Sequence, residues 1–81
     1  METRVAILSI IVEDMDSTEG LNSIIHEYSR FVVGRMGLPY HKRGIHIISL
    51  VLDAPANDIS TLSGRIGRLH GVTSKTAFAK V

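Results

Sequence analysis

The sequence predicts a ferredoxin-like βαββαβ plait, an α+β fold in which a four-stranded antiparallel sheet carries two helices on one face. Four segments rich in aliphatic and β-branched residues predict strands, and two segments with apolar residues at helical spacing predict helices. Along the chain these segments follow the order strand, helix, strand, strand, helix, strand. A chain of 81 residues with no linker-like stretch is typical of one domain, which we expect to span residues 1–81.

The first half of the chain predicts a strand followed by a helix. Residues 4–13 (RVAILSIIVE) are dense in aliphatic side chains and predict the first strand. Asp16 followed three residues later by Glu19 resembles a capping box, so we expect a helix over residues 17–29. The apolar stripe of this helix consists of Leu21, Ile24, Ile25 and Tyr28.

The second half predicts two strands, a helix and a last strand. Residues 31–36 (FVVGRM) predict a strand that Gly37 and Pro39 close, and residues 44–53 (GIHIISLVLD) predict the next one. Pro55 suits the first turn of a second helix, and Gly71 suits a left-handed position at its end. Residues 72–80 (VTSKTAFAK) predict the last strand. The second helix has the apolar stripe Ile59, Leu62, Ile66 and Leu69.

The composition excludes several classes of protein. With no cysteine, the chain has no disulfide, thiolate metal site or thiol catalysis. Hydrophobic residues make up 44% and charged residues 21%, which is too apolar for a disordered chain. The apolar runs are too short to span a membrane, and the N-terminus does not resemble an export signal. We therefore expect a cytoplasmic protein that does not enter membranes.

The first and third predicted strands are apolar on both faces. These are the central strands of a plait, in which helices cover only one face of the sheet. Each aliphatic side chain gains roughly 1.5–3 kcal/mol on burial, and monomers rarely expose a large apolar patch. We therefore expect a homo-oligomer, a dimer or tetramer, packed through the open sheet face; the alternative is a tolerated exposed surface. The predicted interface set is Leu8, Ile10, His46, Ile48, Leu50 and Leu52.

The four histidines do not predict a metal centre. None forms the His-x-His strand pair or the i, i+4 helical pair that directs two imidazoles at one ion, so we expect no metal and no cofactor. His46 is either an imidazole satisfied inside the interface or a catalytic base. No acidic partner lies at a revealing spacing, which favours the interface, and no other catalytic constellation is present.

The segment "GRMGLPYHKRGIHI" (residues 34–47) is the most unusual of the chain. Three of the nine basic residues and none of the eight acidic residues lie in residues 34–46. Arginine is suited to binding a carboxylate or a phosphate through two hydrogen bonds. Three positive charges are too few for tight DNA binding, so we expect no direct DNA binding. The alternatives are a solvated turn, or pairing with Glu13 or Asp14 of a neighbouring subunit. The candidate ligand- or partner-binding residues are Gly34, Arg35, Gly37, Tyr40, His41 and Arg43.

Four stretches, which together span nearly the whole chain, resemble the small regulators of the iron-only hydrogenase system. They are "METRVAILSIIVED", "IIHEYSRFVVGRMGLPY", "GIHIISLVLDAPANDISTLSGRIGRL" and "GVTSKTAFAK". This family looks like a set of stand-alone relatives of ACT domains and of the sensor domain of the nickel-responsive repressor. The resemblance implies the βαββαβ plait, assembly through sheets or edges, and small effectors bound at interfaces.

By this resemblance we expect a non-enzymatic, oligomeric regulatory (sensor) domain that binds a small effector or a hydrogenase-system protein. The repressor's DNA-reading arm and its His-x-His pair have no counterpart here, so neither direct DNA binding nor nickel is implied. One alternative is an assembly module without a small ligand. Another is a small enzyme of the dimeric-barrel type that uses His46.

Overall fold

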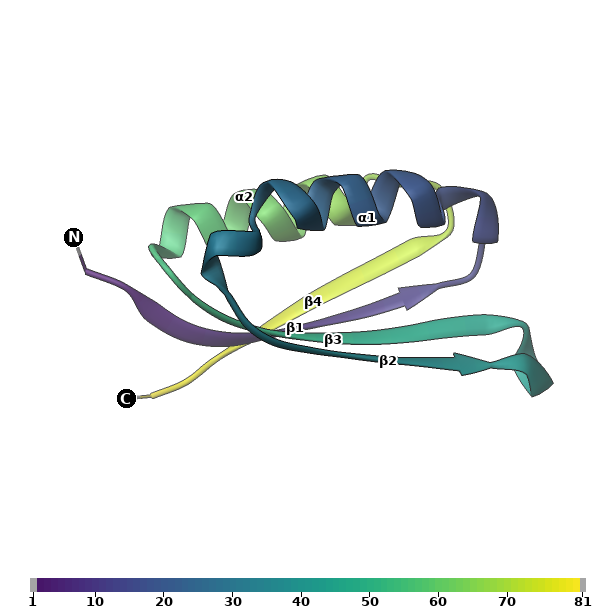
Figure 1. Cartoon of the computed structure of the whole chain (residues 1–81), viewed down its shortest axis with the longest axis horizontal. Helices are drawn as coiled ribbons and strands as arrows, with labels where there is room; N and C mark the ends of the chain where they lie inside the picture. Colours follow the sequence, from purple (N-terminus) through teal and green to yellow (C-terminus); the bar gives the residue numbers. More distant parts are fainter. Residues whose placement is uncertain (1, 81) are drawn as a thin grey trace.

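Two helices lie side by side on one face of a four-stranded sheet, and within residues 2–80 no element covers the other face (Figure 1). The structure is a computed structural model that describes residues 2–80. All three strand pairs are antiparallel and the strand order is β2-β3-β1-β4, which confirms the predicted ferredoxin-like plait. Strands β3 and β1 are central, as expected.

The elements follow the predicted order, with short 3₁₀ turns at three connections. The strands are β1 (Arg4–Val12), β2 (Val32–Tyr40), β3 (Ile45–Ala54) and β4 (Val72–Phe78). The helices are α1 (Thr18–Glu27) and α2 (Ala56–Gly67). The 3₁₀ turns are η1 (Met15–Ser17), η2 (Ser29–Phe31) and η3 (His41–Arg43).

The expected capping box at the start of α1 is wrong. The chain first forms the turn η1, where the Asp14 carboxylate accepts a hydrogen bond from the Asp16 backbone N–H at 3.0 Å. Ser17 then precedes α1, and its hydroxyl donates instead to the carbonyl of His70 at 2.6 Å. The polar side chains of this segment therefore tie the start of α1 to the end of α2 rather than capping α1.

Strand β2 is longer than predicted, because Gly37 and Pro39 do not close it. It pairs with β3 as far as Tyr40, which lies opposite Ile45. Proline is tolerated in an edge strand such as β2, because one side of its backbone has no neighbouring strand and needs no N–H donor. The irregularity expected from the glycines lies earlier, as a bulge between Val32 and Gly34.

The core fills the single layer between the helices and the sheet. Alternate residues of β1 and β3 point into it because side chains alternate along a strand, and one stripe of each helix covers them. Each buried aliphatic side chain contributes roughly 1.5–3 kcal/mol to folding. The buried set is Ala6, Leu8, Ile10, Val12, Leu21, Ile25, Ile48, Leu50, Leu52, Ala54, Ile59, Leu62, Ile66 and Val72.

Candidate functional site

The predicted interface set lies on the wrong face of the sheet. Its five aliphatic members are at most 2% exposed and are covered by the helices, so they cannot meet another subunit; they are Leu8, Ile10, Ile48, Leu50 and Leu52. Their burial is explained by the register, in which Leu8 and Leu50 are direct partners beneath the helices. His46 shares this face of β3, but it lies near the hairpin end of the strand and is only half-buried.

The other face of the sheet is open and apolar; we call it the open face. On the central strands Ile7 and Ile47 remain 45% and 37% exposed, and on β2 Met36 remains 69% exposed. Strand partners share a face, so the register assigns the members of this surface. Those from β1 and β3 are Val5, Ile7, Ser9, Ile11, Ile45, Ile47, Ser49, Val51 and Asp53. Those from β2 and β4 are Gly34, Met36, Leu38, Tyr40, Thr73, Lys75 and Ala77.

The row of residues that crosses the middle of the open face is the most polar one; we call it the polar row. Ser9 pairs directly with Ser49 on the central strands, and Met36 and Lys75 continue the row on the two edge strands. The rows on either side are more apolar, with Ile7 next to Val51 and Ile11 next to Ile47. The open face is therefore a largely apolar surface with two hydroxyl groups at its centre and the charged residues Lys75 and Asp53 nearer its border.

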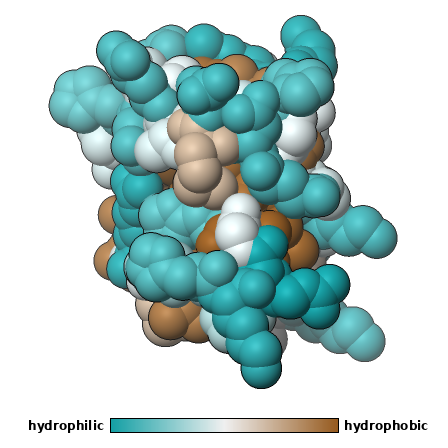
Figure 2. Space-filling model, turned by 90° about the vertical axis from the view of Figure 1, so that its right-hand side faces the viewer, coloured by the Kyte–Doolittle hydropathy of each residue, from teal (hydrophilic) through white to brown (hydrophobic). Residues whose placement is uncertain are grey.

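The structure does not bring the candidate ligand-binding residues of the basic segment into one cluster. Gly34 and Tyr40 belong to the open face, whereas Arg35 and Gly37 pair with core residues and so point to the helix side. Arg35 and Tyr40 are about 17 Å apart along the strand at ~3.3 Å per residue. The turn η3, which holds His41 and Arg43, comes after Tyr40. The end of the molecule that carries this turn is largely hydrophilic (Figure 2).

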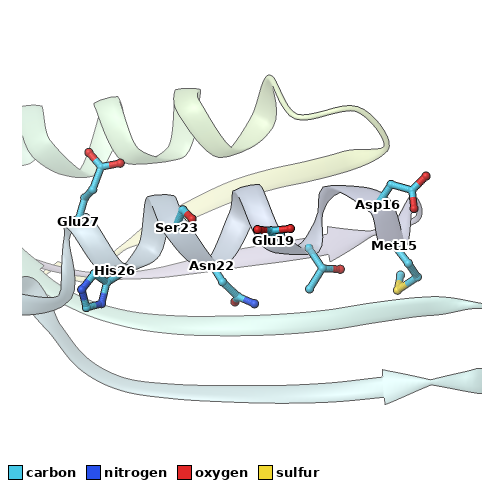
Figure 3. Close-up of a pocket in the computed structure, with 8 residues that line it drawn as sticks. Met15, Asp16, Glu19, Asn22, Ser23, His26 and Glu27 are labelled. Atoms are coloured by element: carbon cyan, nitrogen blue, oxygen red, sulfur yellow. The ribbon is translucent and has the colours of Figure 1, made fainter.

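Arg35 lies instead beside helix α1. Its Nη2 donates to Oδ1 of Asn22 at 2.9 Å, which connects the edge strand to the helix. Asn22 and His26 are four residues apart and both point from α1 toward the sheet, while Glu27 points toward α2 (Figure 3). Asn22 could not be predicted as a site residue from the sequence, because only the folded chain places this polar helix face over β2.

A cavity of about 370 Å³ lies between α1 and β2; we call it the Arg35 groove. Its lining residues are Asn22, Ile25, His26, Ser29, Val32 and Arg35. Toward the start of α1 the same side of the helix borders a wider, shallower hollow, drawn in Figure 3, that shares Asn22 and His26 with the groove. Asp16 and Glu19 line that hollow, so the two ends of the trough differ in charge.

His46 lines a smaller cavity of about 160 Å³ at the hairpin end of the sheet, with Met15, Pro39 and His41. A side chain at Gly37 would place its Cβ 3.4 Å from the His46 Nε2, so this glycine leaves the imidazole room above β2. No hydrogen bond joins His46 to a carboxylate within residues 2–80. In the same part of the chain no group of three or more His, Asp or Glu side chains is arranged to hold a metal ion.

Two contacts of carboxylates with basic side chains tie loops and helices together away from these surfaces. His70 Nδ1 lies 2.6 Å from Asp14 Oδ2, and this hydrogen bond lowers the pKa of Asp14 from its usual 3.8. The Arg65 guanidinium donates to both carboxylate oxygens of Glu27 at 3.0 Å, which joins α2 to α1. These bonds lower the pKa of Glu27 and raise that of Arg65. Among residues 2–80, no helix is long and apolar enough to cross a membrane.

Comparison with known proteins identifies a family and a solved structure of very similar fold. The TM1266-like family, described as "Iron-only hydrogenase system regulator, putative", matches residues 4–76. The solved structure of uncharacterized protein TM1266 from Thermotoga maritima is similar at a TM-score of 0.93 and 34% sequence identity. The match covers 98% of this chain and 100% of that one. No curated protein matches significantly. The resemblance found in the sequence is thereby confirmed.

Proposed function

The chain belongs to the TM1266-like family of iron-only hydrogenase system regulators, and from this premise we propose that it is a non-enzymatic cytoplasmic regulator that works as a homo-oligomer. Its subunits pack open face against open face and bind a small effector or a protein of the hydrogenase system. The observation that carries the assembly is the apolar open face, on which Ile7, Ile47 and Met36 are left exposed.

The dimensions of the open face suit a subunit interface. Four strands about 4.8 Å apart and about nine residues long cover roughly 19 by 30 Å, or ~550 Å² on each subunit. Two such faces bury ~1,100 Å² in total, which exceeds the ~1,000 Å² expected of a specific interface. A second copy also removes the exposed aliphatic side chains from water. Because each is already partly buried in the monomer, completing its burial stabilises the dimer by on the order of 1 kcal/mol.

The polar row supplies the interface with hydrogen-bonding groups. In a two-fold arrangement the same patch meets itself, so a central feature of one subunit lies near its own copy. Ser9 and Ser49 occupy the centre of the face, and their hydroxyl groups both donate and accept. A dyad close to this pair lets the hydroxyls bond across the interface while the apolar rows pack on either side.

A ligand-free assembly module is the second candidate, and the free edge of β2 favours it. The strand pairs only with β3 and exposes Val33, Met36 and Leu38 along its length. Such an edge offers unpaired backbone groups to an added strand of a partner protein. The two candidate functions differ in whether they need a ligand site such as the Arg35 groove. The effector-binding regulator needs one, whereas the assembly module does not.

The oligomer is tested by static light scattering on the wild type and on Ile47→Asp. We expect the wild type to be at least a dimer at micromolar concentration, and the variant to be a folded monomer, because a two-fold interface then buries two carboxylates. Met15→Asp is the matched control: it alters an exposed apolar residue in η1, outside the open face. A monomeric wild type, or a Met15→Asp variant that dissociates equally, contradicts the proposal.

A further inference from the structure

Arg35 carries a charge that no carboxylate balances in the described part of the chain. Among residues 2–80, the carboxylates in contact with a basic side chain are Glu27, bound by Arg65, and Asp14, bound by His70. The polar partner of Arg35 is the neutral Asn22 amide. A guanidinium has five N–H donors in a planar fork, and only one of them is used here. Asn22 holds the side chain against α1, so the remaining donors are available beside the groove rather than spread over the strand.

The Arg35 groove combines this fork with further polar groups and an apolar floor. His26 and Ser29 add an imidazole and a hydroxyl at the rim, and Asn22 adds the amide nitrogen of its side chain. Ile25, which is 5% exposed, and the half-buried Val32 supply apolar surface between them. A few convergent polar groups around an apolar floor, in a cavity of about 370 Å³, are typical of a small-molecule site.

We propose that the Arg35 groove binds a small molecule with one carboxylate and a short apolar part. The carboxylate is held by the Arg35 fork and the rim groups, and the apolar part lies on Ile25 and Val32. This inference rests on the proposed regulatory function and names the chemical class of its effector.

The charge of the surroundings selects a monoanion over a phosphate or a polyanion. Asp16 and Glu19 line the hollow that continues the groove along α1. A phosphate group carries between one and two negative charges near neutral pH, roughly −1.5 to −2 for a monoester, so these carboxylates repel it more strongly. A single carboxylate is neutralised by Arg35 alone.

The groove is connected to the open face through one strand. Arg35 points to the helix side of β2, and the next residue, Met36, points to the open face, where it is 69% exposed. The bulge between Val32 and Gly34 lies directly before Arg35, at a point where the pairing of β2 is already irregular. A ligand bound to Arg35 therefore acts on the strand that contributes Met36 and Leu38 to the proposed subunit interface.

The test is a titration of the isotope-labelled full chain with acetate, butyrate and hexanoate, followed by backbone amide chemical shifts. We expect saturable shifts at Asn22, His26 and Arg35, with affinity that rises from acetate to hexanoate. Arg35→Gln is expected to weaken hexanoate binding about ten-fold or more, the typical effect of losing a charge-assisted hydrogen bond. Arg43→Gln removes the same charge at the hairpin tip and is expected to bind as the wild type does. Butanol, which is uncharged, and inorganic phosphate are expected to bind much more weakly than butyrate.

Three results overturn the inference: no saturable shifts at tens of millimolar hexanoate, equal loss of binding in Arg43→Gln, or phosphate binding as tight as that of hexanoate. Light scattering on the same samples separates this inference from the proposed assembly. An oligomer that binds no carboxylate rejects the groove and leaves the assembly standing. A monomer that binds hexanoate through Arg35 rejects the assembly and supports the groove.

Discussion

At the scale of single residues, Gly71 occupies the most constrained backbone position in the loop between α2 and β4. Its φ of 68° lies in the left-handed region, as predicted, but α2 already ends at Gly67, so Gly71 does not cap the helix. The chain also passes very close to it: a Cβ at this position would lie 2.6 Å from the Asp14 Cβ and 2.9 Å from the Asp14 backbone nitrogen. The adjacent Glu13 N–H donates to the Gly71 carbonyl at 2.7 Å, so the two loops cannot separate without losing a hydrogen bond.

We expect Gly71→Ala to lower the free energy of unfolding by about 3 kcal/mol, through backbone strain together with a steric clash. Gly44→Ala is the matched control. Gly44 has nearly the same φ of 65° but has open space around its Cα, so strain alone costs ~1–2 kcal/mol. Urea unfolding of both variants at one protein concentration measures the difference. Equal losses in the two variants would show that the loops are not in contact.

The Asp14–His70 contact should make the stability of the folded protein depend on pH in the acidic range. The pKa of Asp14 is lowered in the folded protein, so its contribution is present above the unfolded value of 3.8 and is lost as pH falls below it. Asp14→Asn removes that contribution, and the gap in melting temperature between wild type and variant should shrink as pH falls from about 5 to 2.5. Glu2→Gln makes the same charge change at an exposed residue outside the contact. A gap that stays constant with pH would contradict this account.

At the scale of elements, the sequence predicts the order of strands and helices because hydrophobic spacing is a local property. The stripes of both helices and the alternation of β1 and β3 are all found in the structure. Which face of the sheet the helices cover is not local, and both faces of these strands are aliphatic. The sequence nevertheless contained a signal. Ser9 and Ser49 interrupt one face, whereas the alternate residues of the first strand on the other face, from Ala6 to Val12, are all apolar. The polar interruptions mark the face that the helices leave open.

The Arg35 groove could be predicted only in part, because contacts between different elements of the fold are not local in the sequence. Arg35 stands out in the sequence because its segment has no acidic residue. Its partner Asn22 comes from a different element, and the extension of β2 to Tyr40 moves the hairpin tip away from it. Each residue of an extended strand advances the chain by ~3.3 Å, so the residues of the basic segment are spread along β2 rather than clustered.

Two neighbouring residues of β3 test the assignment of the faces. Leu50 is fully buried under the helices, whereas Val51 lies on the open face. Leu50→Asp buries a charge in the core and should unfold the protein, with a loss of about 4 kcal/mol or more. Val51→Asp should leave the circular dichroism spectrum native and change only the oligomeric state. A folded, dissociated Leu50→Asp variant would mean that the faces are assigned the wrong way round.

At the scale of the whole molecule, one layer of core side chains stabilises a chain of 81 residues. Domains of this size bury a smaller share of their surface than larger ones and often gain stability from association. The two helices bury the helix side of the central strands, so the main apolar surface left for further burial is the open face. Packing two sheets face to face then gives each subunit a second apolar layer without adding residues.

This coupling of folding to association predicts that stability depends on protein concentration. If the folded state is a dimer, raising the concentration ten-fold favours it by mass action, and the melting temperature should rise by about 4 °C for two chains of this length. Ile7→Asp places a charge in the middle of the open face and should abolish the dependence, because a folded monomer melts at a temperature independent of concentration. Met15→Asp, outside that face, should keep it. Scanning calorimetry of the three proteins over a hundred-fold range of concentration measures the effect. A wild-type melting temperature that does not change over this range would mean that the open face stays in contact with water, and the oligomeric regulator would have to be abandoned.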